Sequence, residues 1–179
     1  MKKVALHVHT NLSDGALEPT GIISLYRDLD FAFVAVTDHS WLTKPDYFNK
    51  IPDKMDGLLV LKGLELEVEA LCYQHVLEIM GESEILRVFC HPDSYHLTIK
   101  DVNERIARSP FKIDAVEITA LGFYTPKYDT VEIALPKVAT DDAHEESAVG
   151  RAWIEVDNVL TRDALIKAIK ANDFGLGFR

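Results

Sequence analysis

The sequence predicts an α/β protein whose strands form a mostly parallel sheet or barrel. Apolar residues switch repeatedly between short strand patterns and amphipathic helix patterns along the chain. No repeat, low-complexity stretch or Pro- or Gly-rich linker interrupts this alternation, which is typical of α/β folds. The length of 179 residues suits one domain, so we expect residues 1–179 to form a single domain.

The first half of the chain begins with a strand at residues 4–8, where apolar residues occupy every second position. A helix is expected over residues 19–29, because apolar side chains follow a helical spacing after Pro19. Residues 31–36 are continuously apolar, which predicts a strand buried on both faces. Residues 58–68 and 73–80 are expected to pair as a hairpin.

The second half continues the alternation of strands and helices. Thr98 and Asp101 are a capping signal for one helix, and Gly175 follows the end of another. The stretch 121–136 shows no clear pattern. The predicted strands cover 85–90, 115–118, 137–140 and 152–156, and the predicted helices cover 98–108 and 161–172.

Composition narrows the class of protein. The 29 acidic residues exceed the 19 basic ones and give a formal charge of −10, which argues against an extended nucleic acid or a membrane surface as partner. Two cysteines cannot build a disulfide framework, so we expect a reducing, cytoplasmic location. No apolar run reaches the roughly 20 residues that a membrane helix needs.

Histidines gather where predicted strands end. His7 and His9 close the first strand, His39 and His91 each follow an apolar run, and His144 comes shortly after residues 137–140. The ends of parallel barrel strands converge on one rim, where active sites are built. We therefore expect these imidazoles to meet in space.

Acidic residues recur at comparable places, namely Asp14, Asp38, Glu65 and Asp142. His7 and His9 are two residues apart and point to the same side of a strand, as a ligand pair would. The alternative is a pair of ordinary surface or core histidines. Mixed imidazole and carboxylate donors suit zinc, manganese or iron. Spacing alone does not separate Glu65 from Glu67 and Glu69, or Asp142 from Asp141.

Other polar or aromatic residues have plainer interpretations. Asp38 either holds the free N–H of a histidine or caps a loop, with equal weight. Glu117 is expected to be a solvated strand end rather than a support for a histidine or a substrate contact. Cys90, beside His91, is expected to be a small buried residue rather than a ligand. Trp41 is expected to pack rather than to stack on a ring of the substrate.

The ordered motifs resemble those of the PHP (polymerase and histidinol phosphatase) family over residues 4–174. They are His7-Val8-His9-Thr10, Ser13-Asp14-Gly15, Thr37-Asp38-His39, Gly63-Leu64-Glu65, His75, His91-Pro92 and Asp142-Ala143-His144. Each motif alone is weak, but all of them in this order are a specific signal. The Gly-x-Glu and Asp-Ala-His patterns favour Glu65 and Asp142 over their neighbours. The family commonly has Gly-Ser where Thr140-Asp141 stands here, so the extra carboxylate leaves the local charge open.

The resemblance implies a distorted (β/α)7-type barrel with a metal site at the C-terminal rim of the strands. Up to three divalent ions are implied: zinc, manganese or iron, with magnesium as a further candidate. The implied ligands are His7, His9, Glu65 and Asp142 for the first ion, Glu65, His75 and His91 for the second, and Asp14, His39 and His144 for the third.

The implied reaction is hydrolysis of a phosphoester by metal-activated hydroxide. A small phosphorylated metabolite or nucleotide is the expected substrate. The alternatives are a metal-stabilised, non-catalytic PHP-type binding domain and a nuclease acting on nucleic-acid ends. A metal-dependent amidohydrolase on a similar barrel is disfavoured by the motif order and by the lack of a clear lysine ligand.

Overall fold

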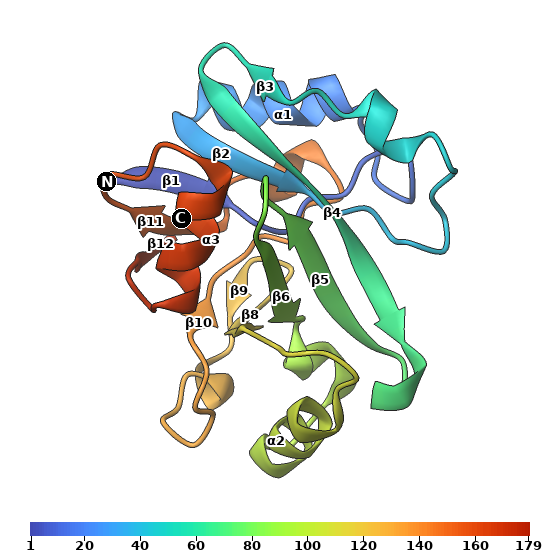
Figure 1. Ribbon diagram of the computed structural model, residues 1–179, viewed down its shortest axis with the longest axis vertical. Helices are drawn as coiled ribbons and strands as arrows, with labels where there is room; N and C mark the ends of the chain where they lie inside the picture. Colours follow the sequence, from blue (N-terminus) through green and yellow to red (C-terminus); the bar gives the residue numbers. More distant parts are fainter.

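One large curved sheet dominates the computed structural model, which describes residues 1–179 (Figure 1). It has ten strands in the order β10-β7-β6-β5-β4-β2-β1-β11-β12, with β3 paired to β4. The strands are β1 Lys2–Ala5, β2 Phe31–Val36, β3 Lys54–Met55, β4 Leu58–Val68, β5 Gln74–Met80, β6 Ile85–Phe89, β7 Ala115–Glu117, β10 Lys137–Val138, β11 Ala152–Val156 and β12 Gly175–Phe178. A separate small hairpin joins β8 Thr119–Ala120 to β9 Phe123–Tyr124.

The sheet closes into a distorted barrel, as predicted. The ring follows the order β1-β2-β4-β5-β6-β7-β10, and its neighbouring strands are parallel except for β5, which is antiparallel to both β4 and β6. Outside this ring, β11 is antiparallel to both β1 and β12. Val8 bridges Ala143 in parallel beyond the ends of β1 and β10. At this point the His9 N–H donates to the Ala143 carbonyl at 2.9 Å, which joins the last barrel segment to the first.

The interior of the barrel is a single apolar cluster to which every strand of the ring contributes. Its members include Val4, Phe33, Leu61, Leu77, Val88, Ala115 and Val138, together with Leu165, Ile166 and Ile169 of helix α3 (Arg162–Lys170). In β2, Phe33 and Ala35 belong to this cluster, whereas Val34 and Val36 belong to a second cluster that packs against another helix. Burial on both faces explains the continuous apolar run of that strand.

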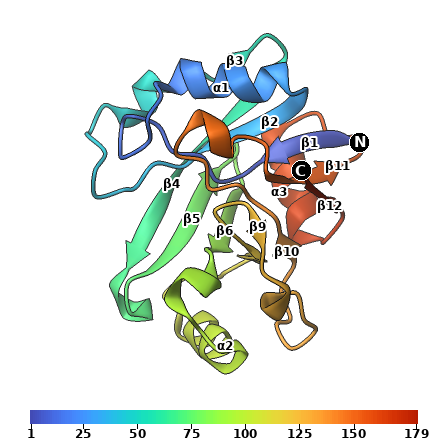
Figure 2. The ribbon, with the colours of Figure 1, turned by 180° about the vertical axis from the view of Figure 1, so that it is seen from behind.

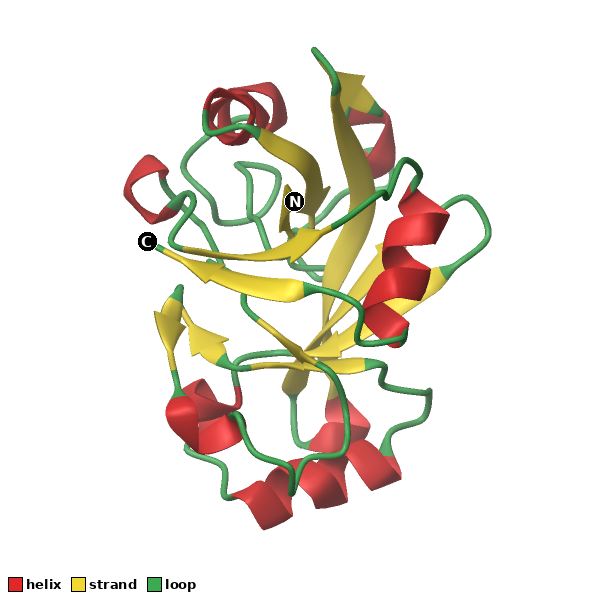
Figure 3. Cartoon of the chain, turned by 90° about the vertical axis from the view of Figure 1, so that its left-hand side faces the viewer, coloured by secondary structure: helices red, strands yellow, loops and turns green.

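Helices are few and lie around the sheet (Figure 3). Helix α1 (Pro19–Asp28) and helix α2 (Ile99–Arg108) occupy opposite ends of the molecule (Figures 1 and 2). Pro19 begins α1, and Thr98 and Asp101 form a complete capping box at the start of α2. The 3-10 turns are η1 Tyr47–Lys50, η2 Glu69–Leu71, η3 Pro92–Tyr95, η4 Pro126–Tyr128 and η5 Glu146–Ala148. None of the helices has both the length and the apolar character required to span a bilayer.

The short strands β3, β8 and β9 and the terminal strand β12 were not predicted. Glycine is depleted in strands, so the run Gly175-Leu176-Gly177-Phe178 gives little strand signal. Gly177 lies opposite Trp153 in the neighbouring strand β11. A Cβ atom at position 177 would come within 2.2 Å of the indole ring, so the glycine makes room for this cross-strand contact.

Candidate metal centre

The rim at the carboxyl ends of the barrel strands brings all nine predicted ligands together. They lie in groups of three or four whose possible ligand atoms are all within 4.8 Å of one another. His7 and His9 follow β1, His39 follows β2, and His91 follows β6. The remaining members are Asp14 on the loop before α1, Glu65 in β4, His75 in β5, and Asp142 and His144 after β10.

Glu65 lies at the centre of the cluster and is only 1% exposed. Its Oε1 atom is 2.8 Å from His75 Nδ1 and 3.0 Å from His91 Nε2. Its Oε2 atom is 2.8 Å from His39 Nδ1 and 3.4 Å from His9 Nε2. Burial acts to raise the pKa of Glu65, but the surrounding imidazoles, His7 foremost, hold that pKa well below its usual range.

The acidic residues that sequence spacing could not separate from Glu65 and Asp142 as ligands lie outside the cluster. Glu67 and Glu69 are exposed beyond the cluster, so Glu65 is the only one of the three that faces it. Asp141 is fully buried but its carboxylate accepts hydrogen bonds from the Tyr26 hydroxyl and the Gly150 N–H, both at 2.7 Å. Burial raises the pKa of Asp141 to about 7. The extra carboxylate therefore anchors the chain behind the site, and it joins no ligand group.

Asp142 is the second buried carboxylate of the cluster. Its Oδ1 atom is 3.4 Å from both His7 Nε2 and His9 Nε2, and these two ring nitrogens are 3.0 Å apart. Its backbone has a φ of 48°, in the left-handed region that is uncommon for residues other than glycine, although aspartate and asparagine adopt it more readily than most. Strained backbone of this kind is typical of functional sites, where surrounding contacts enforce it.

A more open group, which we call the mouth group, consists of His9, Asp14, His39 and His144. The Asp14 oxygens are 3.2 Å from His39 Nε2 and 3.4 Å from His144 Nε2, and the Asp14 side chain is 43% exposed. Gly15 follows where the loop backbone passes close to His9, and a Cβ atom at position 15 would lie 2.7 Å from the His9 carbonyl. The glycine lets the loop fold back against His9 and present Asp14.

The donor atoms of the cluster fit divalent cations. The ion-pair contacts of Glu65 and Asp142 are with imidazoles alone, and no lysine or arginine compensates these buried charges. His39 Nδ1 and His75 Nδ1 are 2.8 Å from Glu65 oxygens, yet neither makes a geometrically acceptable hydrogen bond. His9 Nδ1, His91 Nδ1 and Asp142 Oδ1 are also buried without partners. Buried polar atoms normally have partners, and ligands of a cation are the common exception.

Glu117 supports the cluster from behind, contrary to our expectation of a solvated strand end. It is fully buried, and its Oε1 accepts from His7 Nδ1–H and from the Thr140 hydroxyl, each at 2.7 Å. Its Oε2 accepts the backbone N–H of His91 at 2.7 Å. Because a carboxylate only accepts, it places the His7 proton on Nδ1 and leaves Nε2 for a ligand role. The position at the end of a barrel strand was the only available sequence signal.

Asp38 caps a loop and does not hold a histidine. Its carboxylate accepts from the Thr10 N–H at 2.7 Å, the Thr10 hydroxyl at 2.8 Å and the Ser13 hydroxyl at 2.5 Å. These bonds fix the loop that presents Asp14. Of the two interpretations left open, the loop cap is the correct one.

Trp41 contributes a contact that the sequence did not indicate. Its ring stacks on His39 with centroids 4.4 Å apart and planes 30° apart. The side chain is 48% exposed, so it forms part of the wall beside the mouth group. A tryptophan in a loop gives no sequence signal for such a contact, because the stacking partner is set by the fold.

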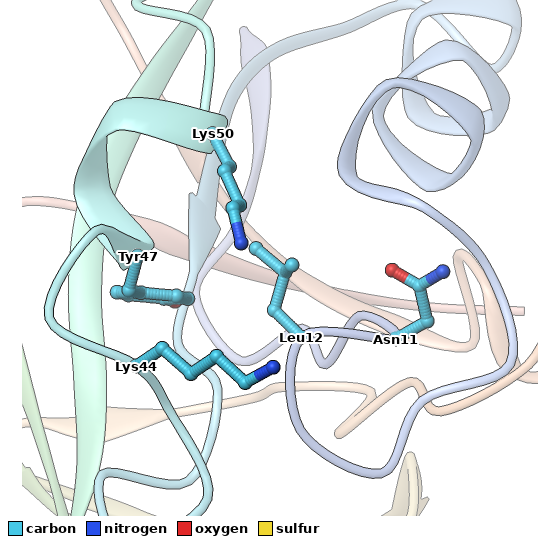
Figure 4. Close-up of a pocket in the computed structure, with 5 residues that line it drawn as sticks. All are labelled: Asn11, Leu12, Lys44, Tyr47 and Lys50. Carbon is cyan, nitrogen blue, oxygen red and sulfur yellow. The ribbon is translucent and has the colours of Figure 1, made fainter.

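A small cavity lies next to the loop that carries Asp14 (Figure 4). It is lined by Asn11 and Leu12 of that loop and by Lys44, Tyr47 and Lys50 of the segment after β2. Lys50 pairs with Asp46 at 3.1 Å, and the Tyr47 hydroxyl lies 3.2 Å from the backbone N of Asp38. None of the cluster residues lines this cavity, so it adjoins the centre without being part of it.

Comparison with known proteins agrees with the architecture. A family model described as PHP-associated (PHP_C) matches residues 132–174. No curated protein matches the chain in sequence.

Solved structures with the same fold include PsfC from Pseudomonas syringae, with a TM-score of 0.72 and 15% identity over 99% of this chain and 91% of that one. A two-domain protein of Bacteroides vulgatus containing a predicted PHP-like metal-dependent phosphoesterase has a TM-score of 0.68 and 15% identity over 99% of this chain. A proposed metal-dependent phosphoesterase of Bifidobacterium adolescentis has a TM-score of 0.65 and 14% identity, covering 94% of this chain and 96% of that one. This chain spans 65% of the length of the Bacteroides protein.

Proposed function

We propose that this chain is a metal-dependent phosphoesterase of the PHP type, which its motifs, its barrel fold and the PHP-associated model matched to residues 132–174 support. The proposed ligands are the nine residues at the rim, and the proposed substrate is a small phosphorylated metabolite or nucleotide. The observation that supports the proposal most directly is the convergence of imidazoles and carboxylates on Glu65 without any lysine or arginine.

The charge of the site favours an anionic substrate although the whole chain is acidic. With up to three divalent ions bound, the carboxylates of Asp14, Glu65 and Asp142 would offset only half of the added charge. A cleft of this kind attracts a phosphate group even on a protein with a net charge of −10. The same net charge opposes binding of a long nucleic acid, so a small substrate is the better match.

The chain's own residues have distinct tasks in this proposal. His7 is oriented by Glu117 through its Nδ1–H, which directs Nε2 toward the cluster. Buried Glu65 and Asp142 supply negative charge at the base of the site. Divalent ions, when bound, supply Lewis-acid activation of water and neutralise charge on the phosphoryl group.

The test begins with metal analysis of the purified protein and reconstitution with manganese, zinc or iron. Hydrolysis of p-nitrophenyl phosphate, glycerol phosphate and nucleoside monophosphates is then measured with and without each ion. We expect His9→Ala and Asp142→Asn to abolish turnover while circular dichroism shows a folded protein. Asparagine is chosen at position 142 because it tolerates the positive φ.

A matched control is His96→Asn. His96 is the one histidine outside the cluster, it is exposed, and its φ of 52° also suits asparagine. Equal rates in wild type, His9→Ala and Asp142→Asn would overturn the catalytic assignment. Metal binding without hydrolysis would favour the non-catalytic binding domain, and activity confined to polynucleotide ends would favour the nuclease.

A further inference from the structure

The thiol of Cys90 belongs to the apolar cluster inside the barrel and also lies among the proposed metal ligands. Its Sγ atom and the possible ligand atoms of His7, Glu65 and His91 all lie within 4.8 Å of one another. Cys90 is fully buried and follows the last residue of β6 directly before His91. We call these four residues the floor group.

The floor group differs from the other clusters in composition and in burial. It is the only group with four members that are all buried, and the only one with a sulfur donor. The mouth group also has four members, but Asp14 is exposed and His144 is half-buried. The two remaining groups have three members each.

Independent contacts point the same side chains at this position. The Glu117 carboxylate accepts the Nδ1–H of His7 and the backbone N–H of His91, so one carboxylate fixes two of the three residues grouped with the thiol. The backbone of His91 has a φ of 23°, an orientation that needs such support. The His91 side chain is only 9% exposed, its Nε2 lies 3.0 Å from Glu65 Oε1, and its Nδ1 is buried without a partner. The thiol has one weak contact of its own, to the Val88 carbonyl at 3.5 Å.

We propose that the Cys90 thiolate is the fourth donor of a closed zinc position formed with His7, Glu65 and His91. On binding, the S–H proton passes to solvent and a sulfur–zinc bond forms. Four protein donors that include a thiolate are typical of closed, tetrahedral zinc sites, whereas a site open to solvent keeps a position for water or substrate. Thiolate also favours zinc over manganese and magnesium, which prefer oxygen ligands. This inference rests on the metal centre of the proposed function and changes its ligand sets. Because Glu117 binds the Nδ1–H of His7, His7 has one ring nitrogen for an ion. In this arrangement His7 and His91 serve the floor zinc, and the other rim ligands, with Glu65 shared, would hold the ions nearer the mouth.

Cobalt substitution tests the sulfur ligand directly. The metal-free protein is titrated with Co²⁺ and its near-ultraviolet and visible absorption is recorded, because a thiolate bound to cobalt gives an intense charge-transfer band. We expect this band in wild type and its loss in Cys90→Ser. Cys72→Ser is the matched control, since Cys72 is the only other cysteine and is exposed.

Zinc binding gives a second readout that does not depend on activity. In competition with a chromophoric chelator, we expect Cys90→Ser to bind its tightest zinc at least about tenfold more weakly than wild type. Cys90→Ala is measured alongside, because a serine hydroxyl in this apolar setting can disturb folding by itself, and circular dichroism checks both variants.

The outcomes separate the two proposals. A charge-transfer band that survives in a folded Cys90→Ser or Cys90→Ala protein overturns the thiolate ligand. Cobalt binding to wild type without such a band also overturns it and leaves the phosphoesterase proposal standing. If neither cobalt nor zinc binds to wild type, the thiolate ligand and the proposed metal-dependent function both fail.

Discussion

The floor and the mouth of the candidate metal centre are held in place by different parts of the fold. Floor residues lie in or directly beside barrel strands, and the buried carboxylate of Glu117 fixes two of them. Mouth residues such as Asp14 and His144 lie on loops, and Asp38 holds the Asp14 loop through hydrogen bonds to Thr10 and Ser13. The strands fix the positions of the floor side chains precisely. Loops fix the mouth side chains less tightly, which would suit the place where a substrate enters and leaves.

Among the substitutions that test this comparison, we expect Glu117→Gln to cause the largest loss, a loss of metal affinity at the floor. The glutamine amide can accept from only one side, so either His7 Nδ1–H or the His91 N–H loses its acceptor. Changes of this outer-shell kind typically cost about 10–100-fold in metal affinity. Competition with a chelator should show that loss at the floor. Glu67→Gln is the control, because Glu67 is exposed on β4, and an equal loss in this control would contradict the assignment.

Asp38→Asn should act on the mouth. The amide nitrogen of asparagine would face a donor, so at least one of three hydrogen bonds to a buried charge is lost. Such a bond contributes about 2 kcal/mol. For a chain of this size that lowers the melting temperature by roughly 4–8 °C. Thermal unfolding of the metal-free protein measures this change.

The decisive readout for Asp38→Asn is the cobalt spectrum. If the floor is independent of the loop, its thiolate band stays at wild-type intensity while cobalt binding at the mouth weakens. Loss of the floor band in the folded variant would show that the two groups are one unit, which would break the comparison.

Trp41→Leu is expected to have the smallest effect. Removing the ring that stacks on His39 costs about 0.5–1.5 kcal/mol, which corresponds to roughly 2–10-fold in affinity for an ion at the mouth. Isothermal titration with Mn²⁺ measures it. Trp41→Phe keeps an aromatic face and should restore most of the loss. Wild-type affinity in Trp41→Leu would mean that the ring only shields His39.

Much of the fold could be predicted because its signals are local. The runs 31–36 and 58–68 and the spacing after Pro19 each define an element from neighbouring residues alone, and the structure has β2, β4 and α1 there. The segment around β8 and β9 gave no such signal, because its strands have two residues each. The strand β12 was missed because its pairing with β11, rather than its own composition, makes it a strand.

The residues of the candidate site also divide into those that local sequence signals could predict and those that they could not. Histidines at strand ends could be placed on one rim from topology alone, and the structure brings them together. The roles of Glu117 and Asp38 could not be predicted, since their burial and partners depend on how the barrel closes around them. The same holds for Cys90, whose position in an apolar run indicates only packing.

The bridge between Val8 and Ala143 also bears on the order of events during synthesis. The first and last ligand segments leave the ribosome far apart in time, because more than a hundred residues separate His7 from Asp142 and His144. A nascent chain therefore presents isolated imidazoles with low affinity for any ion, and full coordination arises only once the residues up to His144 have been translated. Such long-range closure favours slow, late assembly, so cation capture would mark the end of folding rather than guide its start.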